Sequence, residues 1–74
     1  MSLETYRKAI REGKREAIVQ SAQRVFLERG YQGAAMAAIA KDADVSTATL
    51  YKHFANKETL FDAVVADRIQ EFDI

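Results

Sequence analysis

Small polar side chains and hydrogen-bond donors fill the segment 46–57, and no acidic residue interrupts them. Thr47 and Ala48 are small enough to let a helix approach DNA base edges, and threonine suits thymine methyl groups and base acceptors. Donors that can fix register on phosphate oxygens follow in the sequence: Tyr51, Lys52, His53 and Lys57. Free backbone N–H groups at the start of a helix near Lys57 would add a binding site for phosphate. The pattern predicts a surface that binds DNA.

Each of these residues also has a plain structural interpretation. Tyr51 stands between Leu50 and Phe54 in a helical pattern, so its ring could belong to the core with its hydroxyl group at the surface. The role of His53 could be limited to a favourable interaction with the dipole at the end of a helix. Thr47 could be an ordinary exposed residue of a first turn, and the two lysines could be ordinary solvated charge.

The elements that must position these side chains are helices, because the sequence has no Pro, three Gly and no strand-like alternation. We expect an all-α fold, a small helical bundle with a homeodomain-like three-helix core, a helix-turn-helix at about residues 35–54 and the start of a fourth helix. The predicted helices span residues 14–29, 35–43, 47–53 and 57–74. Residues 1–13 form an N-terminal arm or an extension of the first helix, because Gly13 costs about 1 kcal/mol in a helix interior and favours fraying or a break.

Apolar residues at helical spacing predict the core. They are Ala17, Ile18, Ala22, Val25, Phe26, Met36, Ile39, Ala40, Ala43, Val45, Leu50, Phe54, Leu60, Phe61, Val64, Val65, Ile69 and Phe72. Gly30 is placed to end the first helix in left-handed backbone. Ser46 and Asn56 are placed as N-caps, and the connection 42–45 contains Asp residues that tolerate left-handed backbone.

The formal net charge is zero, but the charges are unevenly placed along the chain. Residues 1–30 hold seven basic and four acidic side chains, whereas residues 61–74 hold one basic and four acidic side chains. Because affinity for DNA depends on neutralising phosphates, the acidic end should lie away from DNA. The basic cluster from Arg7 to Arg15 has two interpretations, a solvated helix face or an arm that reaches a phosphate or the minor groove.

Composition excludes several other classes of function. A chain of 74 residues without Cys and with one His has room for one domain, no disulfide and no zinc cluster. It offers no nucleophile–base pair and no Gly-rich phosphate loop, so we expect neither catalysis nor a cofactor. Without a signal-like N-terminus or a long apolar run, we expect a soluble cytoplasmic protein with no membrane partner.

Several groups of residues occur in order at the spacing of one family. They are the run 26–31 (FLERGY), Ile39-Ala40, Val45-Ser46, the run 49–54 (TLYKHF) and the run 57–60 (KETL). Over residues 14–65 the sequence resembles the tetracycline-repressor (TetR) family of bacterial transcription regulators.

The resemblance implies a DNA-binding domain over residues 14–60, with helix 47–53 in the major groove. Thr47 and Ala48 would lie near bases, and Tyr51, His53 and Lys57 would hold phosphates. Weaker contacts would come from Ala35, Met36 and Thr49. The resemblance further implies a repressor that binds a palindromic operator in double-stranded DNA as a homodimer. A small-molecule effector would bind a C-terminal domain, which we expect to be absent here, with helix 57–74 leading towards it.

The sequence departs from the family pattern at a few positions. Ala35 stands where Thr or Ser usually caps the second helix, and losing a cap costs about 0.5–2 kcal/mol. Ala37 and Ala38 replace longer side chains, so the second helix offers little reach towards DNA. Asp44 and Ala48 stand where Gly is frequent, and both are tolerable replacements. A helical protein-interaction module without DNA binding remains the alternative, which a weak response to salt would indicate.

Overall fold

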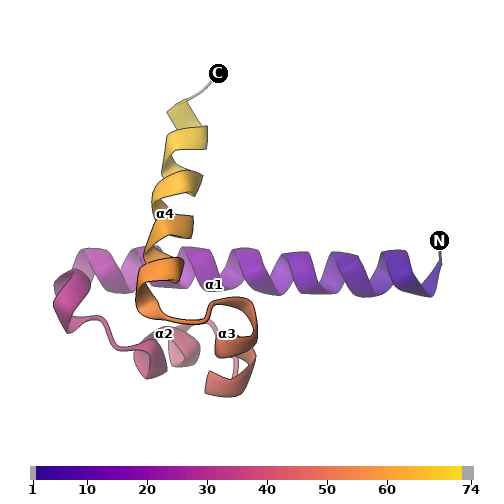
Figure 1. Cartoon of the computed structure of the whole chain (residues 1–74), viewed down its shortest axis with the longest axis horizontal. Helices are drawn as coiled ribbons and strands as arrows, with labels where there is room; N and C mark the ends of the chain where they lie inside the picture. The colour runs from indigo at the N-terminus through magenta and orange to yellow at the C-terminus, as the bar shows by residue number, and fades with distance from the viewer. Residues whose placement is uncertain (1, 73–74) are drawn as a thin grey trace.

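The computed structural model describes residues 2–72, with side chains described for residues 2–69. Four helices make up this part of the chain: α1 (Leu3–Gly33), α2 (Met36–Asp42), α3 (Thr47–His53) and α4 (Lys57–Phe72). The short helices α2 and α3 lie on one side of the long α1, and α4 crosses α1 and extends away on the other side (Figure 1). The residues described include no strand, which confirms the all-α prediction.

Helix α1 is longer than the sequence predicted. Ser2 caps its start by accepting a hydrogen bond from the Thr5 N–H at 3.2 Å. The helix then continues through Gly13, so the expected fraying or break at that residue is wrong. The penalty of about 1 kcal/mol for Gly is tolerated because the flanking Arg, Glu and Lys residues are good helix formers on both sides. Residues 3–13 are therefore an extension of the first helix.

Gly30 interrupts α1 where the sequence predicted its end. Its φ of 73° and ψ of 168° are non-helical, and the last residues up to Gly33 form a further turn after the bend. Backbone of this kind is accessible to Gly because it has no Cβ. The bend brings Tyr31 against Phe26 and Phe61, with ring centroids 5.9 and 5.2 Å from Tyr31. The bend thereby joins the end of α1 to α4.

The core lies where α1 meets the other three helices. Its members are Ile18, Val19, Ala22, Val25, Phe26, Ala34, Ile39, Ala40, Leu50, Phe54, Leu60 and Val64. Burying a side chain the size of Val, Leu, Ile or Phe stabilises the fold by about 1.5–3 kcal/mol. The sequence predicted most of this set but missed Val19 and Ala34. Of the residues that it placed in the core, Ala17 is exposed, and Phe61, Val65 and Ile69 are 37%, 40% and 62% exposed. The side chain of Phe72 lies outside the described residues.

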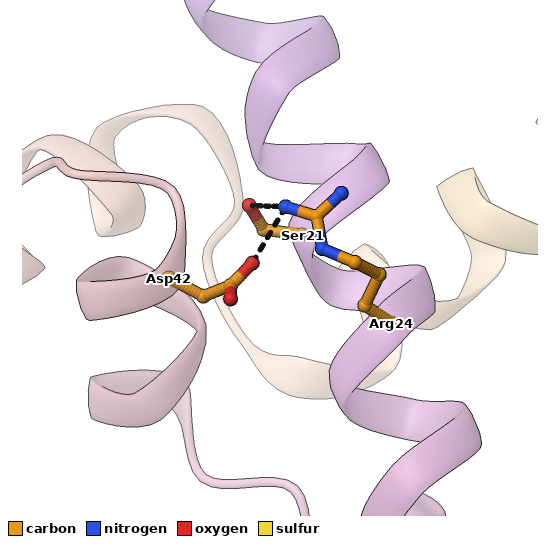
Figure 2. Close-up of polar contacts among 3 residues, drawn as sticks. All are labelled: Ser21, Arg24 and Asp42. Carbon is orange, nitrogen blue, oxygen red and sulfur yellow. Dashed lines mark hydrogen bonds and ion pairs between the residues drawn. The ribbon is translucent and has the colours of Figure 1, made fainter.

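One ion pair joins α1 to the end of α2 (Figure 2). The Arg24 guanidinium donates to Asp42 Oδ2 at 2.7 Å and to the buried Ser21 Oγ at 3.2 Å. The hydrogen bond from Arg24, with a smaller contribution from the Ser21 hydroxyl, holds the pKa of Asp42 below its ordinary value. The contact fixes the end of α2, from which the turn to α3 begins.

Candidate nucleic-acid interface

The turn between α2 and α3 sets the angle at which α3 is presented. Asp44 has a φ of 57° and is the one residue other than Gly with positive φ among those described. Asp is among the few residues that visit this conformation at low cost, because its short polar side chain bonds locally. The Val45 N–H then donates to the Ala40 carbonyl oxygen at 3.0 Å and closes the turn. The expected left-handed Asp in this connection is confirmed.

Ser46 begins α3 as predicted. Its Oγ accepts from the Thr49 N–H at 3.1 Å and donates to Thr49 Oγ1 at 3.0 Å. The first bond satisfies one of the free N–H groups of the helix. The second engages the Thr49 hydroxyl within α3 itself. Thr49 thus contributes to the cap, and the weaker DNA contact expected from it stays a prediction.

The inner face of α3 is fixed in the core. Leu50 is completely buried and Phe54, which follows the helix, is 2% exposed. The Arg15 guanidinium lies 5.0 Å from the centre of the Phe54 ring, a cation–π contact that the sequence pattern did not indicate. These contacts prevent α3 from rolling about its axis, so its other face is held towards solvent.

The outer face of α3 brings together the residues on which the sequence prediction depends. Thr47, Ala48, Tyr51 and Lys52 are all exposed, and His53 is half-buried. Residues four apart share a helix face, so Thr47 lies beside Tyr51 and Ala48 beside Lys52. Tyr51 is 50% exposed, which favours the surface interpretation over the core one. The face contains small side chains next to donors, without an acidic residue.

Lys57 has a partner that sequence reasoning missed. Its Nζ donates to the Tyr31 carbonyl oxygen at 2.7 Å and lies 4.7 Å from the centre of the Tyr31 ring. The ammonium group therefore ties α4 to the bend at the end of α1. A phosphate contact by Lys57 stays a prediction, and it would require the ammonium group to share or leave this carbonyl.

The start of α4 is ordered by Asn56, whose Oδ1 accepts from the Thr59 N–H at 2.8 Å and from the Thr59 hydroxyl at 2.9 Å. This confirms the predicted N-cap. Glu58 occupies the first turn, where a carboxylate is favourable for the helix dipole. The same negative charge would weaken a phosphate seat at this end of α4.

Helix α2 supports the fold and offers few side chains long enough to extend to DNA. Ala35 is its N-cap residue and makes no side-chain hydrogen bond, as its lack of a hydroxyl group predicts. Met36 is half-buried and packs against the core, while Ala37 is exposed. The weaker contacts expected from Ala35 and Met36 stay predictions.

In the part of the chain that the structure describes, no three acidic or His side chains gather as a metal site. No described helix is both long and apolar enough to cross a membrane.

Comparison with known proteins places this geometry in a family. The chain matches the model for bacterial regulatory proteins of the tetR family over residues 18–64. The HTH-type transcriptional regulator UidR of Escherichia coli (strain K12) is 41% identical over 51 residues, which cover 69% of this chain and 26% of that protein. No solved structure matches the chain.

Two mycobacterial relatives differ in their named direction of regulation. The HTH-type transcriptional activator FasR of Mycolicibacterium smegmatis is 42% identical over 55 residues, covering 74% of this chain and 25% of that protein. The HTH-type transcriptional repressor DhaR of Mycobacterium sp. (strain GP1) is 40% identical over 58 residues, covering 78% of this chain and 27% of that protein. The match thus spans about a quarter of the length of these relatives.

The family match, with α2, the turn and α3 in the expected order, shows that this chain belongs to the tetR family of bacterial regulatory proteins and forms its N-terminal helix-turn-helix DNA-binding domain.

Proposed function

We propose that this domain binds double-stranded DNA in a sequence-specific manner, with α3 in the major groove, and thereby regulates transcription. The observation that carries the proposal is the outer face of α3, which begins with two small exposed side chains, while Leu50 and Phe54 hold the opposite face in the core. The major groove admits an α-helix, and each base pair presents a distinct pattern of donors and acceptors there. No catalytic step and no cofactor form part of the proposal.

Thr47 and Ala48 would read bases, because they stand at the start of α3 and leave room for close approach. Tyr51, Lys52 and His53 would hold phosphates and fix register without selecting sequence. Lys57 would join them if its ammonium group shared the Tyr31 carbonyl with a phosphate. The division predicts that sequence preference and total affinity depend on different residues.

Repression is the proposed direction of regulation. A bound domain can block a promoter by occupancy alone, whereas activation requires a further contact with the transcription machinery. The names of DhaR and FasR show that relatives of this chain include both directions. We place the protein in the cytoplasm, where bacterial DNA is accessible.

Binding as a homodimer to a palindromic operator is also a proposal. One copy of α3 can read one half-site, and two copies linked as a dimer read two half-sites about one helical turn apart. Linking converts the second contact into an intramolecular event and raises affinity strongly. A small-molecule effector would act on such a protein through a separate C-terminal domain, outside the residues described here.

The alternative function is a helical protein-interaction module. It is favoured by one observation, the exposed apolar side chains of Leu3, Tyr6 and Ile10, which are 63%, 49% and 44% exposed on α1. An apolar interface with a protein partner would respond little to salt, because counterions are not released when it forms.

Selection of bound sequences from a random pool of duplex DNA tests the proposal. We expect one motif to be enriched and its affinity to fall steeply with salt, with a log–log slope of about −0.9 per phosphate contacted. A pool that stays random after repeated rounds, with weak binding insensitive to salt, would favour the protein-interaction module.

A further inference from the structure

A hollow on the surface between α1 and α3 is lined by residues of both helices. They are Arg11, Lys14, Thr49, Lys52 and His53. Three of the five side chains carry positive charge, a fourth is an imidazole, and none is acidic. The hollow adjoins the outer face of α3, because Lys52 and His53 belong to both surfaces. The hollow thus connects the outer face of α3 to a part of α1 that lies outside the helix-turn-helix.

The same face of α1 changes from apolar to basic along the helix. The buried residues Ile18, Ala22 and Val25 follow one another at steps of four and three. Continuing that spacing towards the N-terminus gives Lys14 and Arg11, and then Arg7, again at steps of three or four. Residues at this spacing lie on one helix face. We call Arg7, Arg11 and Lys14 the basic row.

The N-terminal part of α1 extends past the other helices (Figure 1), and Arg11 and Lys14 lie beside α3 in the hollow. Because Arg11 and Lys14 line the hollow with residues of α3, the row lies on the side of α1 next to α3. The row rises about 10 Å along the helix axis, a length that suits successive groups of a polyanion rather than one small anion.

Two acidic residues of this part of α1 lie on a different side, whereas Glu4 lines a further hollow with Arg7 and Arg11. Glu12 and Glu16 line a separate groove that α1 forms with Ala63 and Asp67 of α4. Within the residues described, the single ion pair joins Arg24 and Asp42, so no member of the basic row forms an ion pair. Glu12 and Glu16 thus lie towards α4, with Arg15 in the same groove, and the hollow beside α3 has no acidic residue in its lining.

We propose that the hollow takes a phosphate of the DNA backbone and that the basic row contacts further phosphates beyond the helix-turn-helix. The inference rests on the proposed function and extends it, because it makes α1 a second contact surface on the same duplex. Arg and Lys donate charge-assisted hydrogen bonds to phosphate oxygens, and Arg can do so with two parallel bonds. The row contributes affinity and leaves the choice of bases to α3.

The test compares two double variants that remove the same charge. Arg11→Gln/Lys14→Gln removes both cations that α1 contributes to the hollow. The matched control, Lys8→Gln/Arg68→Gln, removes two exposed cations that do not line the hollow. Binding to a mixed-sequence duplex of about 30 base pairs is measured over a series of salt concentrations, which reports the number of phosphates contacted. Circular dichroism melting checks that each variant is folded.

We expect the hollow variant to reduce the magnitude of the log–log salt slope by about 0.9 for each phosphate that it no longer binds, and the control to leave the slope nearly unchanged. Arg11→Lys/Lys14→Arg should retain the wild-type slope, because it keeps both charges. Equal slopes for the hollow variant, the control and the wild type would overturn the inference while leaving DNA binding by α3 intact. A wild-type chain that binds no duplex would instead overturn the proposed function and the inference with it.

Discussion

Lys57, one of the proposed phosphate contacts, also has a partner within the fold. Its ammonium group is 2.7 Å from the Tyr31 carbonyl oxygen, and the residue is half-buried between α4 and the bend of α1. A hydrogen bond with a charged partner contributes about 1.5–3 kcal/mol, and this carbonyl also accepts from the Ala34 N–H at 3.4 Å. A phosphate approaching α4 would compete for this donor.

We predict that Lys57→Gln lowers affinity for DNA without changing which bases are preferred. If Lys57 reaches a phosphate, the magnitude of the salt slope falls by about 0.9. If Lys57 only ties α4 to α1, the melting temperature falls and the slope does not. Parallel titration and melting experiments separate the two roles. A changed base preference with an intact slope would contradict the positioning role altogether.

The ion pair of Arg24 and Asp42 gives the fold a dependence on pH. The pKa of Asp42 lies below its ordinary value of 3.8, chiefly because Arg24 donates to its carboxylate. The stabilisation is therefore fully present above the ordinary pKa and is lost as pH falls through the lowered folded value. Both side chains are substantially exposed, at 57% and 39%, so the effect is small.

We predict that Asp42→Asn reduces the loss of stability between about pH 6 and about pH 2.5 compared with the wild type. Arg24→Gln should have the same effect, because it removes the donor that lowers the pKa. Urea unfolding at each pH measures the difference. If stability of the variants fell with pH as steeply as that of the wild type, the ion pair would have no part in acid unfolding.

At the scale of elements, Gly13 and Gly30 of α1 have opposite roles. Gly13 lies in regular helix, and a Cβ added there would meet no atom within 4 Å. Gly30 also has open space around it, but its φ of 73° is one that side chains of L-residues rarely adopt. Backbone conformation, and not the space around the residue, therefore decides the effect of a substitution at both positions.

We predict that Gly13→Ala stabilises the domain by about 0.4–1 kcal/mol, because Ala reduces the conformational entropy of the unfolded chain and suits a helix interior. Gly30→Ala should destabilise it by about 1–2 kcal/mol, because Ala is strained at positive φ. Thermal unfolding followed by circular dichroism measures both. Stabilisation by Gly30→Ala would show that the bend is not required, and destabilisation by Gly13→Ala would show that α1 is not regular helix there.

Local signals explain how much of this architecture the sequence could predict. Ser46 and Asn56 as N-caps, the left-handed Asp44 and the end of regular helix at Gly30 depend on residues within one turn of each other, and all are confirmed. Ala17 was misplaced because a small side chain carries little information about which face is buried. The continuity of α1 through Gly13 depends on the strength of both flanking segments, which a single-residue penalty does not measure.

Contacts between distant residues could not be predicted in the same way. Arg24 and Asp42 are 18 residues apart, and Lys57 and Tyr31 are 26 apart. Nothing in their local sequence indicates which partner each charge will find, because the helix packing brings the pairs together. The exposed outer face of α3 was predictable from helical spacing, whereas the contact of Lys57 with Tyr31 and the hollow beside α3 were not.

At the scale of the whole molecule, charge and shape are arranged together. Helix α3 lies on one side of α1, and α4 extends away on the other (Figure 1). Asp62 and Asp67 are carried on α4, so their negative charge is directed away from the surface formed by α3 and the basic row. A domain with no net charge can thereby present one basic side to a polyanion.

The central claim is that α3 enters the major groove with Ala48 close to the bases, and Ala48→Leu tests it most directly. The control is Ala9→Leu, the same enlargement at another exposed helical position, on α1. We predict that Ala48→Leu weakens binding to the selected duplex by at least about tenfold, which corresponds to about 1.4 kcal/mol of binding free energy. Both variants should melt as the wild type does. Equal affinity of Ala48→Leu, Ala9→Leu and the wild type for that duplex would contradict the placement of α3 in the groove.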